Sequence, residues 1–262
     1  MIAVCIATYN QEAYISHAIE SVLAQQCDEP FRVYIGDDAS MDNTQSICEQ
    51  YAAKDKRVTY VRREQNIGLV ANTIDLYRRS MTDGCKYIAM LDGDDYWMDE
   101  HKLQLQVDYL KTHPEVGLVH TGAYELKADQ QTLMDDHQIP TGDLSQCYGL
   151  YGARQTNCTV VFRANLLREE ELAALETQHF PILDYPLYGL FSQRTSFAFL
   201  PKPTAVWRNH TSVSQPNNRS AQRHYWQERL RMWRWLDEQH PGRFHYKALK
   251  AILWYIRQNM QA

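Results

Sequence analysis

The 262-residue sequence lacks the patterns that mark several common classes of protein. No run approaches the roughly 18 apolar residues that a membrane-spanning helix needs, and the first residues, MIAVCIATYN, contain no basic segment typical of a secretory signal. The six cysteines form no CxxC pair and no zinc-ligand spacing, which is typical of buried thiols in a reducing compartment. We therefore expect a cytoplasmic protein, peripheral to a membrane at most, with no zinc site.

Glycine-rich phosphate loops are also missing, because neither GxGxxG nor GxxxxGK occurs. No Ser or Cys stands in a context that resembles a nucleophilic triad, so a covalent enzyme intermediate is not expected. The net charge of −5 is uneven, since residues 219–262 carry +6 and the remainder carries −11. An acidic body of this kind excludes nucleic acid as the expected partner of the main surface.

The first half of the sequence alternates short apolar runs with amphipathic segments. Strands are predicted at 2–7, 32–36, 58–61, 86–91 and 116–121, and helices at 11–26, 43–53, 69–80 and 99–112. This alternation favours a mostly parallel α/β sheet with helices on both faces. After residue 122 the pattern is weaker, with strands expected at 159–163, 197–200 and 204–208 and helices at 166–176, 187–193, 220–239 and 244–260.

Polar residues follow three of the predicted strands, in the segments ATYNQE, GDDAS and DGDD. Ligands of open α/β sheets bind at the carboxyl ends of the strands, so we expect these segments at one edge. Asp92, Asp94 and Asp95 lie within four residues, and one of them would have to take up a proton unless a positive charge lies between them. On an extended segment Asp92 and Asp94 can face one side, where hard oxygen ligands suit Mg²⁺ or Mn²⁺ shared with substrate phosphates. A single acidic pair after a strand is often only a turn or a helix cap, but three such strand ends at one edge favour a site.

Five ordered segments resemble the family 2 glycosyltransferases: ATYNQEAYISHAIESVLAQ, VYIGDDASMDNT, NIGLVANT, YIAMLDGDDYW and LDYPLYGLF. The resemblance implies the GT-A fold, a Rossmann-like and mostly parallel α/β sheet, and the inverting transfer of a sugar from a nucleoside-diphosphate sugar. It is dense over residues 1–100 and thinner from 122 onward. It implies a catalytic domain at 1–218, with a nucleotide-sugar-binding half at 1–121 and an acceptor-binding half at 122–218, followed by a C-terminal helical extension at 219–262.

The resemblance assigns most of the donor site to the strand ends of the first half. Tyr9 would lie against the nucleobase, Asp38 would accept a hydrogen bond from a pyrimidine ring, and Asp94 would ligate Mn²⁺ or Mg²⁺. Asp92 would touch the ribose or the metal, and Asp95 would face the sugar. The further residues implied around the nucleotide sugar are Thr8, Asn10, Glu12, Asp37, Asn66, Gly68, Asn72 and Gly93. An acidic contact of the Asp38 kind fits uracil or thymine best, which favours a UDP-sugar.

The second half is expected to supply the catalytic base. The resemblance assigns that role to Asp184 in ILDYPLYGLF, although the same position also fits a helix N-cap, and the two roles are compatible. It assigns His210 in WRNHTSVS to the metal or the diphosphate, while a lone loop histidine is otherwise a surface residue. The acceptor is expected to be a hydroxyl of a glycan or of a lipid-linked molecule in cell-surface polysaccharide synthesis.

Residues 219–262 combine aromatic residues with Arg and Lys, which leaves three interpretations. They are a helical pair packed on the catalytic domain, a basic surface at an anionic inner membrane, and a homodimer interface. Two other functions compete with sugar transfer. A sugar-phosphate nucleotidyltransferase usually opens with a glycine-rich basic loop, which ATYNQE lacks. A non-catalytic nucleotide-sugar-binding protein would share every site residue except a working base.

Overall fold

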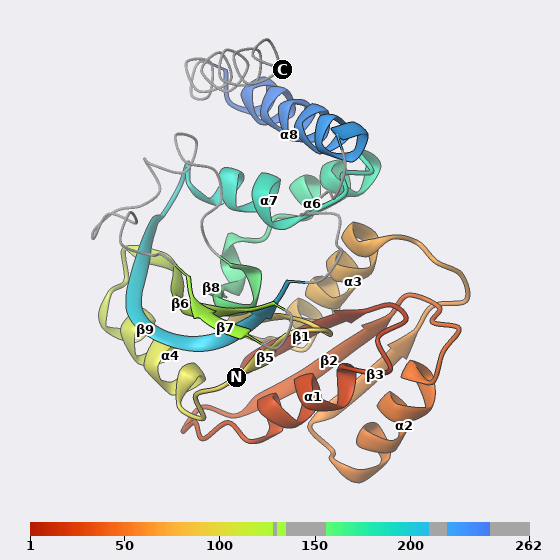
Figure 1. Cartoon of the computed structure of the whole chain (residues 1–262). Helices are drawn as coiled ribbons and strands as arrows, with labels where there is room; N and C mark the ends of the chain where they lie inside the picture. The colour runs from red at the N-terminus through yellow and green to blue at the C-terminus, as the bar shows by residue number, and fades with distance from the viewer. Residues whose placement is uncertain (128–129, 135–155, 210–218, 242–262) are drawn as a thin grey trace.

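The computed structural model describes residues 1–127, 130–134, 156–209 and 219–241 (Figure 1). The first half alternates as predicted, through β1 (Ile2–Thr8), α1 (Ile15–Leu23), β2 (Phe31–Asp37), α2 (Thr44–Lys54), β3 (Val58–Arg62), α3 (Leu69–Thr82), β4 (Tyr87–Asp92), β5 (Tyr96–Trp97) and α4 (Lys102–Thr112). The second half contains β6 (Val116–Lys127), β7 (Gln130–Leu133), β8 (Val161–Arg163), α6 (Glu169–Thr177), α7 (Asp184–Phe191), β9 (Ser196–Arg208) and α8 (Arg219–Gln239), with short 3₁₀ turns at Asn157–Thr159 and Ala164–Leu166.

In the described residues, one nine-stranded sheet runs through both halves of the chain in the order β3-β2-β1-β4-β8-β6-β9-β5, with β7 paired to β6. Strands β1 to β4 are parallel, β8 is antiparallel to both β4 and β6, and β9 is parallel to β6. In this register Thr8 pairs with Asp37, and Ala7 pairs with Asp92. The carboxyl ends of β1, β2 and β4 therefore meet at one edge of the sheet.

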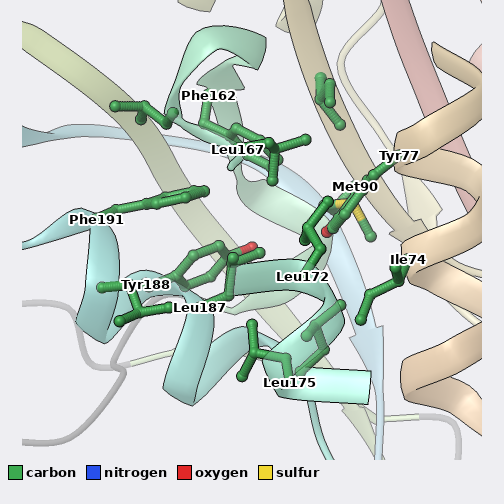
Figure 2. Packing of buried hydrophobic residues seen from close by; sticks show 14 of the residues in the cluster. Ile74, Tyr77, Met90, Phe162, Leu167, Leu172, Leu175, Leu187, Tyr188 and Phe191 are labelled. Carbon is green, nitrogen blue, oxygen red and sulfur yellow. The ribbon is translucent and has the colours of Figure 1, made fainter. Parts of the chain in front are cut away.

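The sheet is buried on both faces, which explains the continuous apolar runs of its central strands. In β1, Ala3 and Cys5 face a core formed with α3, α6, α7 and α8, whereas Ile2, Val4 and Ile6 face a core formed with α1, α2 and α4. Figure 2 shows the first core, where side chains of α3 and β8 converge on those of α6 and α7. Because α7 packs in this core, the position of its first residue, Asp184, is set by the core as a whole.

Helix α8 covers α6 and α7 on the side away from the sheet (Figure 1). Its side chains Met232, Trp233, Trp235 and Leu236 are buried in the core shared with α7. Its Arg231 donates hydrogen bonds to the carbonyls of Gln178 and His179, just after α6. The packed-helix interpretation of the tail thus holds for residues 219–241, and the second helix expected at 244–260 lies outside the described residues. Within the described ranges, no helix has both the length and the apolar character needed to cross a membrane.

Several expected elements have other bounds in the structure, and two helices and two strands among them show the physical reason. Helix α1 begins at Ile15 rather than 11, because residues 12–14 form a turn closed by a hydrogen bond from Tyr14 to the Gln11 carbonyl. Helix α4 begins at Lys102 rather than 99, because Asp99 accepts the N–H of His101 and closes a turn.

The strands expected at 197–200 and 204–208 form the single strand β9. Its pairing with β6 shifts register where Gly122 meets Pro203. A proline has no N–H to donate to the ladder, so an irregularity at this point lets one strand continue through a segment that looks interrupted in the sequence.

Candidate active site

The loops that follow β1 and β2 are hydrogen-bonded to each other at the carboxyl edge of the sheet. The N–H of Asn10 donates to Ser40 Oγ at 2.9 Å, and the N–H of Met41 donates to Asn10 Oδ1 at 2.8 Å. Asn10 (φ 52°) and Ala39 (φ 64°) adopt left-handed backbone conformations, which a non-glycine residue keeps only when its surroundings enforce them. These contacts hold the two loops together on one side of the site at this edge.

The acidic turn, residues 92–95, follows β4 at the same edge. Asp92 ends the strand, and the N–H of Asp95 bonds to the Asp92 carbonyl at 3.0 Å, so the D-x-D segment is a tight turn and not the extended segment expected from sequence. The N–H of Gly93 donates to the Ala7 carbonyl at 3.0 Å. A Cβ on Gly93 would lie 2.9 Å from Thr8 Oγ1, so only glycine allows the turn to approach the loop after β1 this closely.

Burial and mutual repulsion both disfavour the charged forms of Asp92 and Asp95. Burial, and then the negative charge of Asp94, raise the pKa of Asp92 to about 7. Burial and the charges of Asp92 and Asp94 also raise the pKa of Asp95 well above its usual range. The Asp95 side chain is 1% exposed and accepts the backbone N–H of Arg208 at 2.8 Å. The turn therefore holds more negative charge than its protein neighbours compensate, and it favours a cation.

Asp184, the expected base, lies beside the acidic turn. Its charge contributes to the raised pKa of Asp92, although the two residues come from opposite halves of the chain. Burial raises the pKa of Asp184 itself, against the opposing effects of the Tyr185 N–H and the charge of Arg229. The N-cap of α7 is Leu183, so Asp184 is the first helical residue and not the N-cap considered from sequence. Its Oδ1 accepts the N–H of Tyr185 at 2.8 Å.

Two residues that sequence reasoning missed connect α7 to the acidic turn. Asn157 Nδ2 donates to both carboxylate oxygens of Asp92 at 3.3 Å, and the Tyr188 hydroxyl donates to Asn157 Oδ1 at 3.0 Å. Asn157 is in a short 3₁₀ turn outside every quoted segment, and Tyr188 lies in LDYPLYGLF, where the resemblance assigns a role to Asp184 alone.

Exposed apolar side chains gather on the loops after β1, β2 and β3. Tyr9 is 42% exposed, Met41 83%, Ile67 41% and Leu69 44%. Asp38 joins the third loop to the second, because its two carboxylate oxygens accept the N–H groups of Ile67 at 2.7 Å and Gly68 at 2.9 Å. An aromatic face beside apolar side chains suits a nucleobase. If Asp38 contacts the base as predicted, the ring N–H of the base would be a third hydrogen-bond donor to this carboxylate, beside the N–H groups of Ile67 and Gly68.

Asp37 and Asn72, both expected at the nucleotide, are buried beneath these loops. Asp37 accepts the N–H of Ser40 at 2.9 Å and the hydroxyl of Tyr60 at 2.6 Å. Asn72 Nδ2 donates to the Gly36 carbonyl at 2.7 Å, and its Oδ1 accepts from Arg63 at 2.9 Å. The structure gives both residues a supporting position, and their direct contact with the nucleotide stays a prediction.

The remaining predicted residues divide by exposure. Thr8 is buried and donates to Gln11 Oε1 at 2.7 Å, while Glu12 is exposed and accepts from Asn43 Nδ2 at 2.7 Å. Asn66 is exposed on the loop after β3. His210 lies outside the described residues.

The acidic turn fits a divalent cation that also binds a substrate. No group of three His, Cys, Asp or Glu side chains suited to a metal ion occurs among the described residues. Mg²⁺ and Mn²⁺ sites commonly use one or two carboxylates and take their other ligands from water and phosphate oxygens. Asp92 and Asp94 offer carboxylate oxygens, and the raised pKa of Asp92 is the response expected of such a ligand without its cation.

The chain belongs to glycosyl transferase family 2, whose pattern matches residues 3–168. An uncharacterised protein of Mycobacterium tuberculosis is 33% identical over 230 residues, which cover 85% of this chain and 62% of that protein. This chain therefore spans less than two thirds of that relative.

Two solved structures share the fold. TarS of S. aureus (residues 1–349) in complex with UDP-GlcNAc matches 94% of this chain and 69% of its own, with a TM-score of 0.67 and 17% identity. The mannosyltransferase PcManGT of Pyrobaculum calidifontis, in complex with GDP-Man and Mn²⁺, matches 96% of this chain and 74% of its own, with a TM-score of 0.60 and 16% identity. The predicted GT-A fold is confirmed.

Proposed function

We propose that this protein is an inverting glycosyltransferase that moves a sugar from a nucleoside-diphosphate sugar, in the first instance a UDP-sugar, to an acceptor hydroxyl. The observation that carries the proposal is the meeting of Asp92, Asp94 and Asp184 at the carboxyl edge of the sheet, where burial, and then the charges of Asp94 and Asp184, raise the pKa of Asp92 to about 7. Membership of family 2 supports sugar transfer. The UDP-GlcNAc bound to TarS and the GDP-Man and Mn²⁺ bound to PcManGT support a nucleotide sugar and a metal.

In this proposal the donor lies along the carboxyl edge of β1, β2 and β4. Tyr9 contacts the base, and the loop that Asp38 holds through Ile67 and Gly68 borders it. Asp94 and Asp92 hold Mn²⁺ or Mg²⁺ together with the diphosphate. When bound, the cation acts as a Lewis acid that stabilises the charge of the departing diphosphate, an effect worth several kcal/mol.

Asp184 acts on the acceptor. The acceptor oxygen forms its bond to the anomeric carbon as the bond to the diphosphate oxygen breaks, so the configuration inverts in one displacement. The acceptor proton passes to the Asp184 carboxylate, and a base positioned in this way typically contributes about 10²–10⁴-fold to the rate. The raised pKa of Asp184 supports this role, because it makes the carboxylate a stronger proton acceptor.

A donor screen tests the function. Purified protein is mixed with UDP-Glc, UDP-GlcNAc or GDP-Man, Mn²⁺ and glycan or lipid-linked acceptors, and nucleoside diphosphate release is measured. With the active donor, Asp184→Asn should lose at least about 10²-fold in turnover and keep its affinity for the donor. Glu170→Gln, an exposed carboxylate change on α6, is the matched control and should keep full activity. A binding protein without activity would show donor binding but no release in the wild type.

We also propose that the enzyme works at the cytoplasmic face of the inner membrane, on acceptors for cell-surface polysaccharide. The support is the net charge of +6 on residues 219–262. Because Trp233 and Trp235 are buried, the contact with lipid would depend on basic side chains and not on these two aromatics. Sedimentation with anionic phosphatidylglycerol vesicles, weakened by salt and absent with neutral vesicles, is the expected result. Equal binding to both vesicle types would contradict it.

A further inference from the structure

Arg208, the last residue of β9, is hydrogen-bonded to two residues of the acidic turn. Its backbone N–H donates to Asp95 Oδ1 at 2.8 Å, and its guanidinium Nη1 donates to the backbone carbonyl of Asp94. The side chain and the main chain of one residue therefore hold two consecutive residues of the turn. The functions assigned above to the turn do not use this arginine.

The guanidinium is itself fixed by three rings. Its Nη2 lies 2.9 Å from His17 Nδ1, and because arginine has no acceptor, His17 Nδ1 must accept this hydrogen bond. Its Cζ lies 4.7 Å from the centroid of Tyr96 and 5.2 Å from that of Tyr14, distances at which a cation and an aromatic face attract. His17 stacks on Tyr96 with centroids 4.0 Å apart. The arginine is thus held by α1, by the loop after β1 and by β5 at once.

This arrangement differs from an ordinary surface arginine. A planar guanidinium with donors in a fixed fork satisfies the Asp94 carbonyl and His17 together while it lies over the Tyr96 and Tyr14 rings, which the ammonium of lysine cannot do. Moreover, Asp94 is the residue expected to ligate the cation, and a shift of its carbonyl would turn its carboxylate. Groups that orient metal ligands in this way change metal affinity by about 10–100-fold when they are removed.

We propose that Arg208 is a positioning residue for the acidic turn, which sets the direction of the Asp94 carboxylate toward the cation and the diphosphate. The inference rests on the proposed function of that turn. Arg208 touches neither the cation nor the donor in this scheme, so it acts through Asp94 and Asp95.

The test measures Mn²⁺ affinity in the presence of UDP by calorimetry, together with the melting temperature. Arg208→Lys and Arg208→Met should weaken Mn²⁺ affinity by about 10-fold or more. His17→Phe, which keeps a ring on Tyr96 but removes the acceptor of Nη2, should weaken it less. Arg234→Met, an exposed arginine of α8, is the control and should bind as the wild type does.

The outcomes distinguish the positioning role of Arg208 from the proposed metal site itself. If folded Arg208→Lys and His17→Phe bind Mn²⁺ as tightly as the wild type, the positioning role is overturned while the proposed function stands. If the wild type itself binds no Mn²⁺ with UDP, the metal site is overturned and this inference with it. Should Arg208→Met fail to fold, the other two variants decide by the same criterion.

Discussion

Asn157 donates its side-chain amide to both carboxylate oxygens of Asp92, at 3.3 Å each. This contact joins the second half of the chain to the acidic turn of the first. Asn157 is in turn held by the Tyr188 hydroxyl, which lies one helical turn after Asp184 on α7. The distance between the acidic turn and the proposed base is therefore fixed by a chain of hydrogen bonds as well as by core packing.

Removing the Tyr188 hydroxyl should destabilise the protein. Tyr188 is fully buried, so Tyr188→Phe leaves Asn157 Oδ1 without this donor and should lower the free energy of unfolding by about 1–3 kcal/mol. Turnover should fall several-fold, because Asn157 then holds Asp92 less firmly. Urea denaturation and initial rates measure the two effects. Tyr109→Phe on α4, at a half-buried site, should change stability by less than about 0.5 kcal/mol; equal effects of the two variants would count against the chain of contacts.

Gly93→Ala should displace the acidic turn. The added Cβ would collide with Thr8 Oγ1 and Gln11 Oε1, and such overpacking costs about 1–3 kcal/mol of stability. Because the turn must move away from β1, Mn²⁺ affinity should fall with it, as measured by titration in the presence of UDP. The control is Gly84→Asn, at a left-handed position with open space around it, where backbone strain should cost some stability but leave the Mn²⁺ affinity unchanged. Unchanged Mn²⁺ affinity in Gly93→Ala would show that the close approach is not needed.

The contact between α7 and α8 allows a double-mutant cycle. A Cβ on Gly189 would lie 2.6 Å from Leu236 Cδ1, so Gly189→Ala should destabilise by about 1–3 kcal/mol. Leu236 is fully buried, and Leu236→Ala should cost about 2–5 kcal/mol. In the double variant the new methyl group occupies part of the space that the leucine leaves. The double variant should therefore lose less stability than the sum of the single losses, and strict additivity would mean that α8 does not pack on Gly189.

His120 predicts a pH dependence of stability. It is buried on β6 against Phe199, its Nε2 has no hydrogen-bond partner in the described part of the chain, and burial lowers its pKa to about 3. The unfolded chain takes up a proton near pH 6.5 and the folded protein does not, so stability is complete above that pH and falls as the pH drops toward 3. Between pH 7 and 5 the loss should be about 2 kcal/mol.

The contribution of this one residue is isolated by comparison with His120→Leu. Unfolding curves of both proteins at several pH values give the difference, which cancels the titration of the other buried groups. Parallel curves of unfolding free energy against pH would mean that the pKa of His120 is the same in the folded and the unfolded protein, which would contradict this prediction.

The sequence predicts the edge of the sheet better than the geometry of the site. Thr8, Asp37 and Asp92 each follow an apolar strand, and parallel pairing places such residues together whatever lies between them. The shape of the acidic turn could not be predicted, because it depends on the space between Gly93 and Thr8. The roles of Asn157, Tyr188 and Arg208 could not be predicted either, although Tyr188 and Arg208 lie in quoted segments, since their partners are far away in the chain and no period or spacing relates them.

The sequence also does not show which of the residues expected to contact the nucleotide are enclosed by other side chains. In the sequence, Asp37 and Asp38 look alike, but the first is enclosed beneath the loop with Tyr60 and Ser40 while the second holds Ile67 and Gly68. Only the direction of each side chain from the end of β2 separates them. The side chains of neighbouring residues at a strand end point to opposite sides of the sheet. A sequence motif that contains both residues therefore does not show which environment each side chain enters.

The most direct test of the account is the binding of Mn²⁺ in the presence of UDP, followed by electron paramagnetic resonance of the free ion. We predict that the wild type binds one Mn²⁺ per chain and that UDP strengthens this binding. Asp94→Asn, which keeps the shape of the side chain but removes its charge, should lose it, and Asp28→Asn on an exposed loop should not. An Asp94→Asn protein that binds Mn²⁺ as tightly as the wild type would contradict the central claim that the acidic turn holds the cation.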